Sequence, residues 1–230
     1  MSPVQKKALV VIFPGFNILD VSGPVSVLFN SDFAVSYAAK DELTTSQENM
    51  IVRRNISFAE AKLRMDDYEI LIVPGSRPTS TLPLLQTDEN DRSSEIIDFI
   101  SGFASDLGHN GVRQRTVLSV CIGAYFLAAA GVLDGLVATT HRLAVPGLRI
   151  AVANYVERHP GAKGTKIVPE SPSDLVPYMD AGRNPSGVRV ITSGPMVHGI
   201  DAALHFVSLS AGRSVSVEIA ELIGHHWREM

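Results

Sequence analysis

The chain has 230 residues, of which 45% are hydrophobic, so it is long enough to bury a substantial core. Its formal net charge is -4, and it has no arginine-rich or lysine-rich run, which argues against a nucleic-acid partner. The single cysteine excludes an intramolecular disulfide and a cysteine-based zinc cluster, and it fits a reducing compartment.

The N-terminal region predicts a buried strand and not a membrane segment. Its apolar run from Lys7 to Phe13 is too short to span a bilayer, and it lacks the small-residue cleavage site of a signal peptide. The run is rich in β-branched residues and stops at Pro14 and Gly15, which is typical of a strand buried on both faces. We therefore expect one cytoplasmic domain over residues 1–230, with no membrane partner and no cofactor.

Strands and helices are expected to alternate along the rest of the chain. The apolar patterns predict strands at 33–39, 69–73, 116–120, 136–139 and 188–192, and helices at 20–30, 93–107, 122–130 and after residues 146, 199 and 214. This alternation implies right-handed crossovers and a mostly parallel sheet with helices on both faces, an α/β flavodoxin-like three-layer sandwich. The Pro-, Gly- and Ser-rich stretch from Pro160 to Gly187 is expected to be a long excursion over the surface.

Cys121 stands where the strand 116–120 runs directly into a helix. At such a nucleophile elbow, backbone N–H groups and the helix dipole point at the sulfur and favour the thiolate. The alternative is a buried cysteine that packs as a small apolar side chain. Two further loops, at 14–20 and 74–78, leave the same carboxyl edge of the expected sheet, where ligands of such folds bind. Their convergence favours the catalytic interpretation.

Several blocks of the sequence resemble the ThiJ/PfpI superfamily, which has the class I glutamine-amidotransferase-like fold. They lie at residues 13–24, 73–75, 120–135, 138–141 and 192–204. The Leu-Asp-x-x-Gly-Pro block at 19–24 is similar to the branch that contains isocyanide hydratases and the amidotransferase-like domains of some AraC-type regulators. The resemblance implies a homodimer that acts on a small-molecule substrate.

The hydratase branch implies roles for Cys121 and Asp20. The thiolate would attack the terminal carbon of an isocyanide, and Asp20 would act as the acid/base that protonates this carbon and later orients a water molecule. That role requires a carboxyl pKa raised toward neutrality, which partial burial beside a thiolate would supply. From the residues alone, Asp20 is better explained as the N-cap of a helix that starts at Val21.

Two backbone N–H groups are expected to stabilise the developing negative charge, one from Ile122 and one from Gly75 or Ser76. Gly75 would let the backbone approach closely because it has no Cβ. Ser76 stands where the family commonly has a second glycine. Arg77 follows it, either as a solvent-facing charge or as a group that holds an acidic part of the substrate.

Ile122 also departs from the family, because the residue after the cysteine is usually threonine in hydratases and histidine in protease-like members. Isoleucine cannot transfer a proton, so it would instead give the site an apolar wall suited to a hydrophobic substrate. His198 and His141 are the histidines that could reach the site, and each also suits an exposed or structural role. His225 and His226 have no third ligand spaced around them, so no metal site is expected.

Three hypotheses follow. The first is a cysteine-dependent isocyanide hydratase-like lyase or hydrolase that acts on a small apolar electrophile. The second is a non-catalytic or redox-sensing homologue with an oxidisable Cys121. The third, glyoxalase- or deglycase-like activity on dicarbonyls, is weakened because Asp20 has no assured histidine partner. Away from the site, Asp201 is expected to be a helix-start charge stabilised by the dipole.

Overall fold

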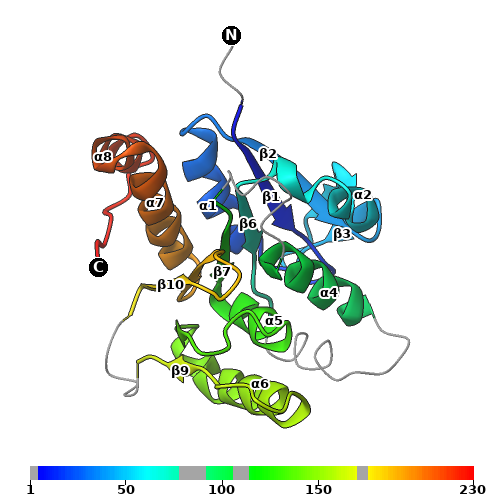
Figure 1. Cartoon of the computed structure of the whole chain (residues 1–230). Coiled ribbons are helices and arrows are strands. Elements are labelled where there is room, and N and C mark those ends of the chain that lie inside the picture. Colours follow the sequence, from blue (N-terminus) through cyan, green and yellow to red (C-terminus); the bar gives the residue numbers. More distant parts are fainter. Residues whose placement is uncertain (1–4, 78–91, 106–113, 170–175) are drawn as a thin grey trace.

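The computed structural model describes residues 5–77, 92–105, 114–169 and 176–230. Its central sheet has seven strands in the order β10-β11-β7-β6-β1-β2-β5, and β10 is the antiparallel member (Figure 1). The strands are β1 Lys7–Val11, β2 Ala34–Ala39, β5 Ile56–Ser57, β6 Ile70–Val73, β7 Thr116–Val120, β10 Tyr178–Arg183 and β11 Arg189–Ser193. The order of β2, β1, β6, β7 and β11 is that of a flavodoxin-like fold, so strand addition reverses between β1 and β6.

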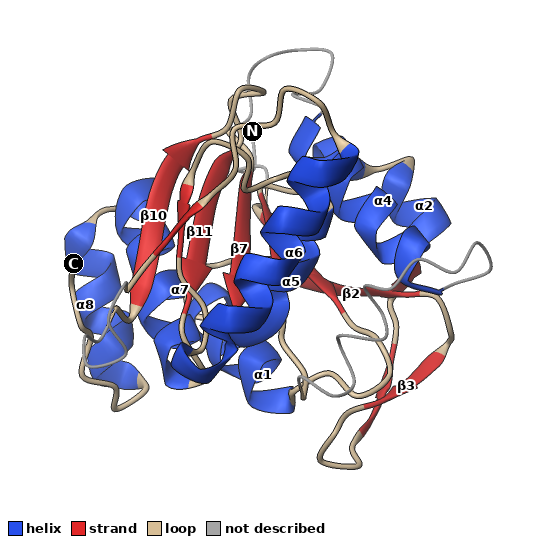
Figure 2. Ribbon diagram, turned by 90° about the horizontal axis from the view of Figure 1, so that it is seen from below, coloured by secondary structure: helices blue, strands red, loops and turns tan. Residues whose placement is uncertain are grey.

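Helices cover both faces of this sheet, which confirms the predicted three-layer α/β sandwich (Figures 1 and 2). One face carries α1 Ile18–Phe29, α7 Val197–Ala211 and α8 Arg213–Leu222, and the other carries α2 Phe58–Lys62, α4 Arg92–Ser105, α5 Ala124–Ala129 and α6 Val145–Arg158. Short 3-10 helices lie at Met65–Asp67, Cys121–Gly123 and Arg142–Ala144. The small sheets pair β3 Leu43–Thr45 with β4 Ile51–Arg53, and β8 Val137–Ala138 with β9 Lys166–Ile167.

The central strands are buried along their whole length. All residues of β6 and β7 are buried, because helices lie over both faces of the sheet. Such strands need no polar alternation, which explains why β6 is a continuous apolar run and why β7 is mainly apolar, with Thr116 and Ser119 as its hydroxyl residues. The same runs made these strands predictable.

The prediction of a surface excursion from Pro160 to Gly187 is wrong, because this stretch contains β9 and the edge strand β10. Only Tyr178 is fully buried in β10, and the strand carries Asp180, Gly182 and Arg183 in place of an apolar run. An edge strand needs less apolar surface than a central one, since one of its sides has no sheet partner. The polar composition of this stretch therefore gave no apolar pattern from which β10 could be predicted.

The turn that follows the nucleophile packs so closely under the end of β6 that glycine is required at position 123. A Cβ built on Gly123 would lie 2.2 Å from the carbonyl oxygen of Val73 and 3.0 Å from that of Pro74. Backbone atoms cannot move aside cheaply. We expect Gly123→Ala to lower the free energy of unfolding by about 3 kcal/mol, measured by urea denaturation.

The matched control is Gly102→Ala in the interior of α4. The added methyl group would lie 3.4 Å from the flexible Cε of Met65, and alanine is the better helix former by about 1 kcal/mol. This variant is therefore expected to be as stable as the parent chain or more so. Equal losses in the two variants would contradict the packing argument.

Asp201 lies fully buried in the second turn of α7, so the expectation of a dipole-stabilised helix start is wrong. Its Oδ1 accepts hydrogen bonds from His225 Nε2 at 2.8 Å and from the Arg228 N–H at 3.0 Å, and its Oδ2 accepts from Arg228 Nη1 at 2.8 Å. This carboxylate therefore fixes the C-terminal segment against α7.

Removing this carboxylate leaves a half-buried histidine and an arginine without their acceptor. We expect Asp201→Ala to lower the free energy of unfolding by about 3 kcal/mol, measured by denaturant titration. Glu229→Ala is the control, since it breaks an exposed ion pair with Arg213 in the same segment and should leave the midpoint nearly unchanged. A loss in the control as large as in Asp201→Ala would show that the buried position of Asp201 is not the cause.

Candidate active site

Three loops meet at the carboxyl edge of the sheet, where the strand order reverses. The loop after β1 leads to Asp20, the loop after β6 carries Gly75, and β7 ends directly at Cys121. A fourth segment, the connection from β11 to α7, adds Met196. The sequence predicted the first three loops, and the parallel sheet brings them together because parallel strands present their carboxyl ends at one edge.

Cys121 occupies a strained elbow. Its φ of 56° lies in the left-handed region, which costs a residue other than glycine about 1–2 kcal/mol. Two contacts hold it there: the Cys121 N–H donates to the carbonyl of Gly194 at 3.1 Å, and the hydroxyl of Thr140 donates to the Cys121 carbonyl at 2.7 Å. Strain of this kind, held in place by the surrounding strands, is typical of functional positions.

The Asp20 carboxyl group is fully buried and clamped between two backbone donors. Its Oδ2 accepts the N–H of Gly75 at 3.0 Å, and its Oδ1 accepts the N–H of Met196 at 3.1 Å. Burial nevertheless outweighs these bonds and raises the pKa of Asp20 to about 7. The predicted N-cap role is wrong, because α1 starts earlier and Asn17 caps it by accepting the N–H of Leu19 and of Asp20.

Gly75 is the point around which the site is assembled. A Cβ built there would lie 2.9 Å from Asp20 Oδ2, 2.9 Å from the Ile122 nitrogen and 3.0 Å from the Cys121 Cβ. Any larger residue would therefore push the carboxyl group, the nucleophile elbow and the β6 loop apart. Its N–H already holds Asp20, so a role for this donor toward a developing anion stays a prediction.

The thiol is protonated at neutral pH. Burial, followed by the neighbouring Asp20 carboxylate, raises the pKa of Cys121 to about 12, and the N–H of Ile122, which donates a hydrogen bond to the sulfur, lowers it only in part. The expectation that the elbow itself favours the thiolate is wrong. The following helix, Ala124–Ala129, is short, and loss of hydration outweighs its dipole.

The other predicted neighbours of the sulfur have structural surroundings. Ile122 is 1% exposed and belongs to the hydrophobic core, and its role as an apolar wall facing the substrate stays a prediction. Ser76 donates its hydroxyl to the carbonyl of Gly15 at 2.6 Å and pairs with Phe16, which fixes the β6 loop on the β1 loop. Arg77 is exposed at the end of the first described range, and its contact with a substrate stays a prediction.

The histidines lie near the elbow without bonding to the thiol. His141 accepts the N–H of Leu143 at its Nδ1, at 3.1 Å, and so caps a 3-10 turn. His198 is 8% exposed and packs on Gly194, where an added Cβ would lie 2.4 Å from its Nδ1. Within the described residues, no histidine is among the groups that shift the pKa of Cys121. A cysteine–histidine pair is therefore not assembled here.

Met196 was missed by the sequence analysis although its N–H holds Asp20. Its φ of 46° places it in the left-handed region just before α7, and its side chain is 44% exposed. The available signal was its position after Ser193-Gly194-Pro195, a turn that leaves β11 at the carboxyl edge of the sheet. A role for Met196 in the site could be inferred only from its place at this edge of the sheet.

Neither a metal centre nor a membrane segment is found in the parts of the chain that the structure describes. In those ranges, no three His, Cys, Asp or Glu residues are grouped so that they could hold a metal ion. Within the same ranges, every helix is too short or too polar to cross a bilayer.

Comparison with known proteins identifies relatives of this chain. An uncharacterised protein of Streptomyces lividans is 30% identical over 147 residues, 61% of this chain and 91% of its own length. The isonitrile hydratase of Pseudomonas putida is 30% identical over 133 residues, 57% of this chain but only 50% of the hydratase. The crystal structure of Drosophila melanogaster DJ-1beta shares the fold, with a TM-score of 0.70 at 18% identity, over 97% of this chain and 100% of that one. Residues 6–181 match the DJ-1/PfpI family model, and the chain therefore belongs to the DJ-1/PfpI family.

Proposed function

We propose that this chain is a cysteine-dependent isocyanide hydratase-like enzyme that converts a small apolar isocyanide to the N-substituted formamide. The observation that carries the proposal is the buried Asp20 carboxyl group, with a pKa of about 7, beside a thiol that is protonated at neutral pH. A thiol in this state needs a base, and a group that titrates near 7 can both accept and return a proton. The isonitrile hydratase relative supports the choice of substrate.

The first half of the reaction moves one proton from sulfur to carbon. Ionised Asp20 accepts the Cys121 proton as the sulfur attacks the terminal isocyanide carbon, and a C–S bond forms. Protonated Asp20 then delivers the proton to that carbon, which gives a thioimidate, R–N=CH–S–Cys121. The Ile122 N–H, already directed at the sulfur, stabilises the charge on it before attack.

The second half consumes water. Ionised Asp20 orients a water molecule, removes one of its protons as the oxygen adds to the thioimidate carbon, and passes that proton to the nitrogen. Asp20 then takes the proton of the new hydroxyl group as the C=O bond forms and the C–S bond breaks, and returns it to the sulfur, so that the formamide R–NH–CHO leaves. Atoms balance as one isocyanide and one water giving one formamide, with no change of oxidation state for the protein.

Redox sensing through Cys121 is the second candidate function, supported by the half-buried position of this residue and the N–H donor at its sulfur. Peroxides react with thiolates, so the raised pKa of Cys121 predicts slow oxidation and ranks this function lower. Glyoxalase- or deglycase-like activity ranks third, because neither His141 nor His198 bonds to the thiol in the described structure.

The deciding experiment follows substrate and sulfur together. The full chain is incubated with cyclohexyl isocyanide, 4-nitrophenyl isocyanide or methylglyoxal, and products are identified by proton NMR. A parallel sample is treated with hydrogen peroxide and its intact mass is measured. Catalytic formation of formamide supports the hydratase, whereas stoichiometric oxidation with no turnover would replace it by the sensor.

The homodimer expected from the resemblance is also part of the proposal. Sedimentation velocity over a range of concentrations measures it directly, and a single species at the 24.8 kDa mass of one chain would contradict it.

A further inference from the structure

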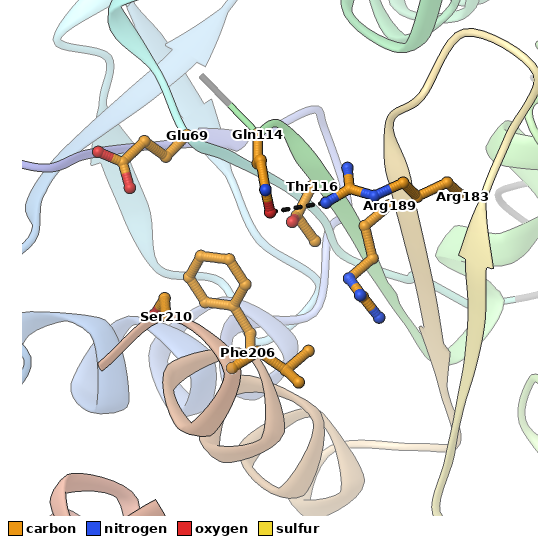
Figure 3. Close-up of a pocket in the computed structure, with 8 residues that line it drawn as sticks. Glu69, Gln114, Thr116, Arg183, Arg189, Phe206 and Ser210 are labelled. Atoms are coloured by element: carbon orange, nitrogen blue, oxygen red, sulfur yellow. Dashed lines mark hydrogen bonds between the residues drawn. The ribbon is translucent and has the colours of Figure 1, made fainter. Parts of the chain in front are cut away.

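A pocket lies at the edge of the sheet opposite to Cys121. Figure 3 shows the side chains that line it. Thr116 and Arg189, the first residues of β7 and β11, line it, so it opens at the amino ends of the strands. Phe206 and Leu209 from α7 form an apolar wall. Its volume of about 320 Å³ is at the lower end of the range for ligand pockets, which suits a small ligand.

Two arginines on neighbouring strands lie opposite each other at this pocket. Arg183 of β10 and Arg189 of β11 are direct partners in the antiparallel register, and both line the pocket. Like charges placed directly opposite each other destabilise a sheet, so negative groups close to the pair stabilise it. Figure 3 shows their side chains on the same side of the pocket, across from Phe206.

Neighbouring groups fix both guanidinium groups in place. Arg189 donates to the Asp180 carboxylate at 2.5 Å, which balances its charge. Among the described residues, the acceptors of Arg183 are neutral oxygens, the Gly187 carbonyl at 2.5 Å and the Gln114 side-chain oxygen at 2.6 Å. These hydrogen bonds fix the Arg183 side chain but do not neutralise its positive charge, which can therefore attract an anion in the pocket.

We propose that this pocket binds a small organic anion, with its carboxylate or phosphate group at Arg183 and Arg189 and its apolar body against Phe206 and Leu209. Planar guanidinium groups suit such oxyanions, because they donate paired hydrogen bonds. Glu69 also lines the pocket and adds one negative charge, which favours an anion with a single acidic group over a polyphosphate. The site does not depend on the reaction at Cys121.

Isothermal titration with four probes tests the proposal and separates the two kinds of acidic group. Benzoate and phenyl phosphate combine an anion with a ring, inorganic phosphate lacks the ring, and benzyl alcohol lacks the charge. We expect at least one ring-bearing anion to bind about tenfold or more tightly than both partial probes. Equal binding of inorganic phosphate would overturn the apolar part of the proposal, and no binding of either ring-bearing anion would overturn all of it.

Two exposed substitutions locate the binding. Arg183→Gln removes the charge, and Gln114→Glu keeps the size of the side chain but places a carboxylate on Arg183. Each is expected to weaken the better probe about tenfold or more, as loss of a charged hydrogen bond does. Arg53→Gln, on the exposed β4, is the control and should bind as the parent chain does. Unchanged binding in both pocket variants, with folding verified by thermal unfolding, would overturn the assignment.

Discussion

Cys121→Ala is expected to abolish formamide production, lowering kcat by at least about 10⁴-fold. Every step of the proposed reaction passes through a bond to this sulfur, so no other group can substitute for it. Alanine keeps the Cβ and tolerates the left-handed φ about as well as cysteine does, so the fold should be retained. Initial rates with a saturating isocyanide, together with a urea titration of the same sample, measure both expectations.

Ser119→Ala, two residues earlier on β7, is the matched control for Cys121→Ala. Its hydroxyl is fully buried and has no hydrogen-bond partner in the described structure, so its removal costs no interaction. The rate should stay within about threefold of the parent rate. If this variant lost as much activity as Cys121→Ala, disturbance of β7 and not the missing sulfur would explain both.

The sequence predicted those parts of the site that follow from topology. A buried parallel strand is mainly apolar along its length, and β1, β6 and β7 all are, so their carboxyl ends could be assigned to one edge. Once that edge was known, Asp20, Gly75 and Cys121 belonged to one neighbourhood. The fold and the meeting of these three residues therefore needed no atomic detail.

The remaining features depend on exact geometry. Whether Asp20 caps α1 or enters the site depends on where the helix begins, and Asn17 takes the cap because its side chain accepts two N–H groups. The state of the thiol depends on how deeply the elbow is buried, which overrides the dipole argument made from position alone. Met196 contributes only its backbone N–H, so its residue type carried no signal.

Asp20→Asn is expected to lower kcat by about 10²- to 10⁴-fold, because the amide cannot accept and return the proton. In the parent enzyme the rate should rise with pH through about 7, where Asp20 becomes ionised and able to accept the thiol proton. That rising limb should be absent in the variant. A limb near pH 4 in the parent enzyme would contradict the role, and Asp67→Asn, at the opposite edge of the sheet and paired with Lys7, should leave the profile unchanged.

The same substitution should change stability in the opposite direction. Asp20 has a pKa of about 7 in the folded chain against an ordinary value of 3.8, so between these pH values the folded state holds a proton that the unfolded state has lost. The free energy of unfolding therefore falls as pH rises through this window, by up to about 4 kcal/mol at about 1.4 kcal/mol per pKa unit. Asparagine does not titrate, so Asp20→Asn should lose this fall. At pH 8 the NH2 group of asparagine faces a backbone N–H and cannot accept its hydrogen bond, which reduces the gain in the free energy of unfolding by about 2 kcal/mol. The variant is still expected to be more stable than the parent chain. Urea titrations of both proteins at pH 5 and pH 8 measure the difference. A parent chain that is more stable at pH 8 than at pH 5, with this gain lost in Asp20→Asn, would contradict the raised pKa of the buried Asp20 carboxyl group.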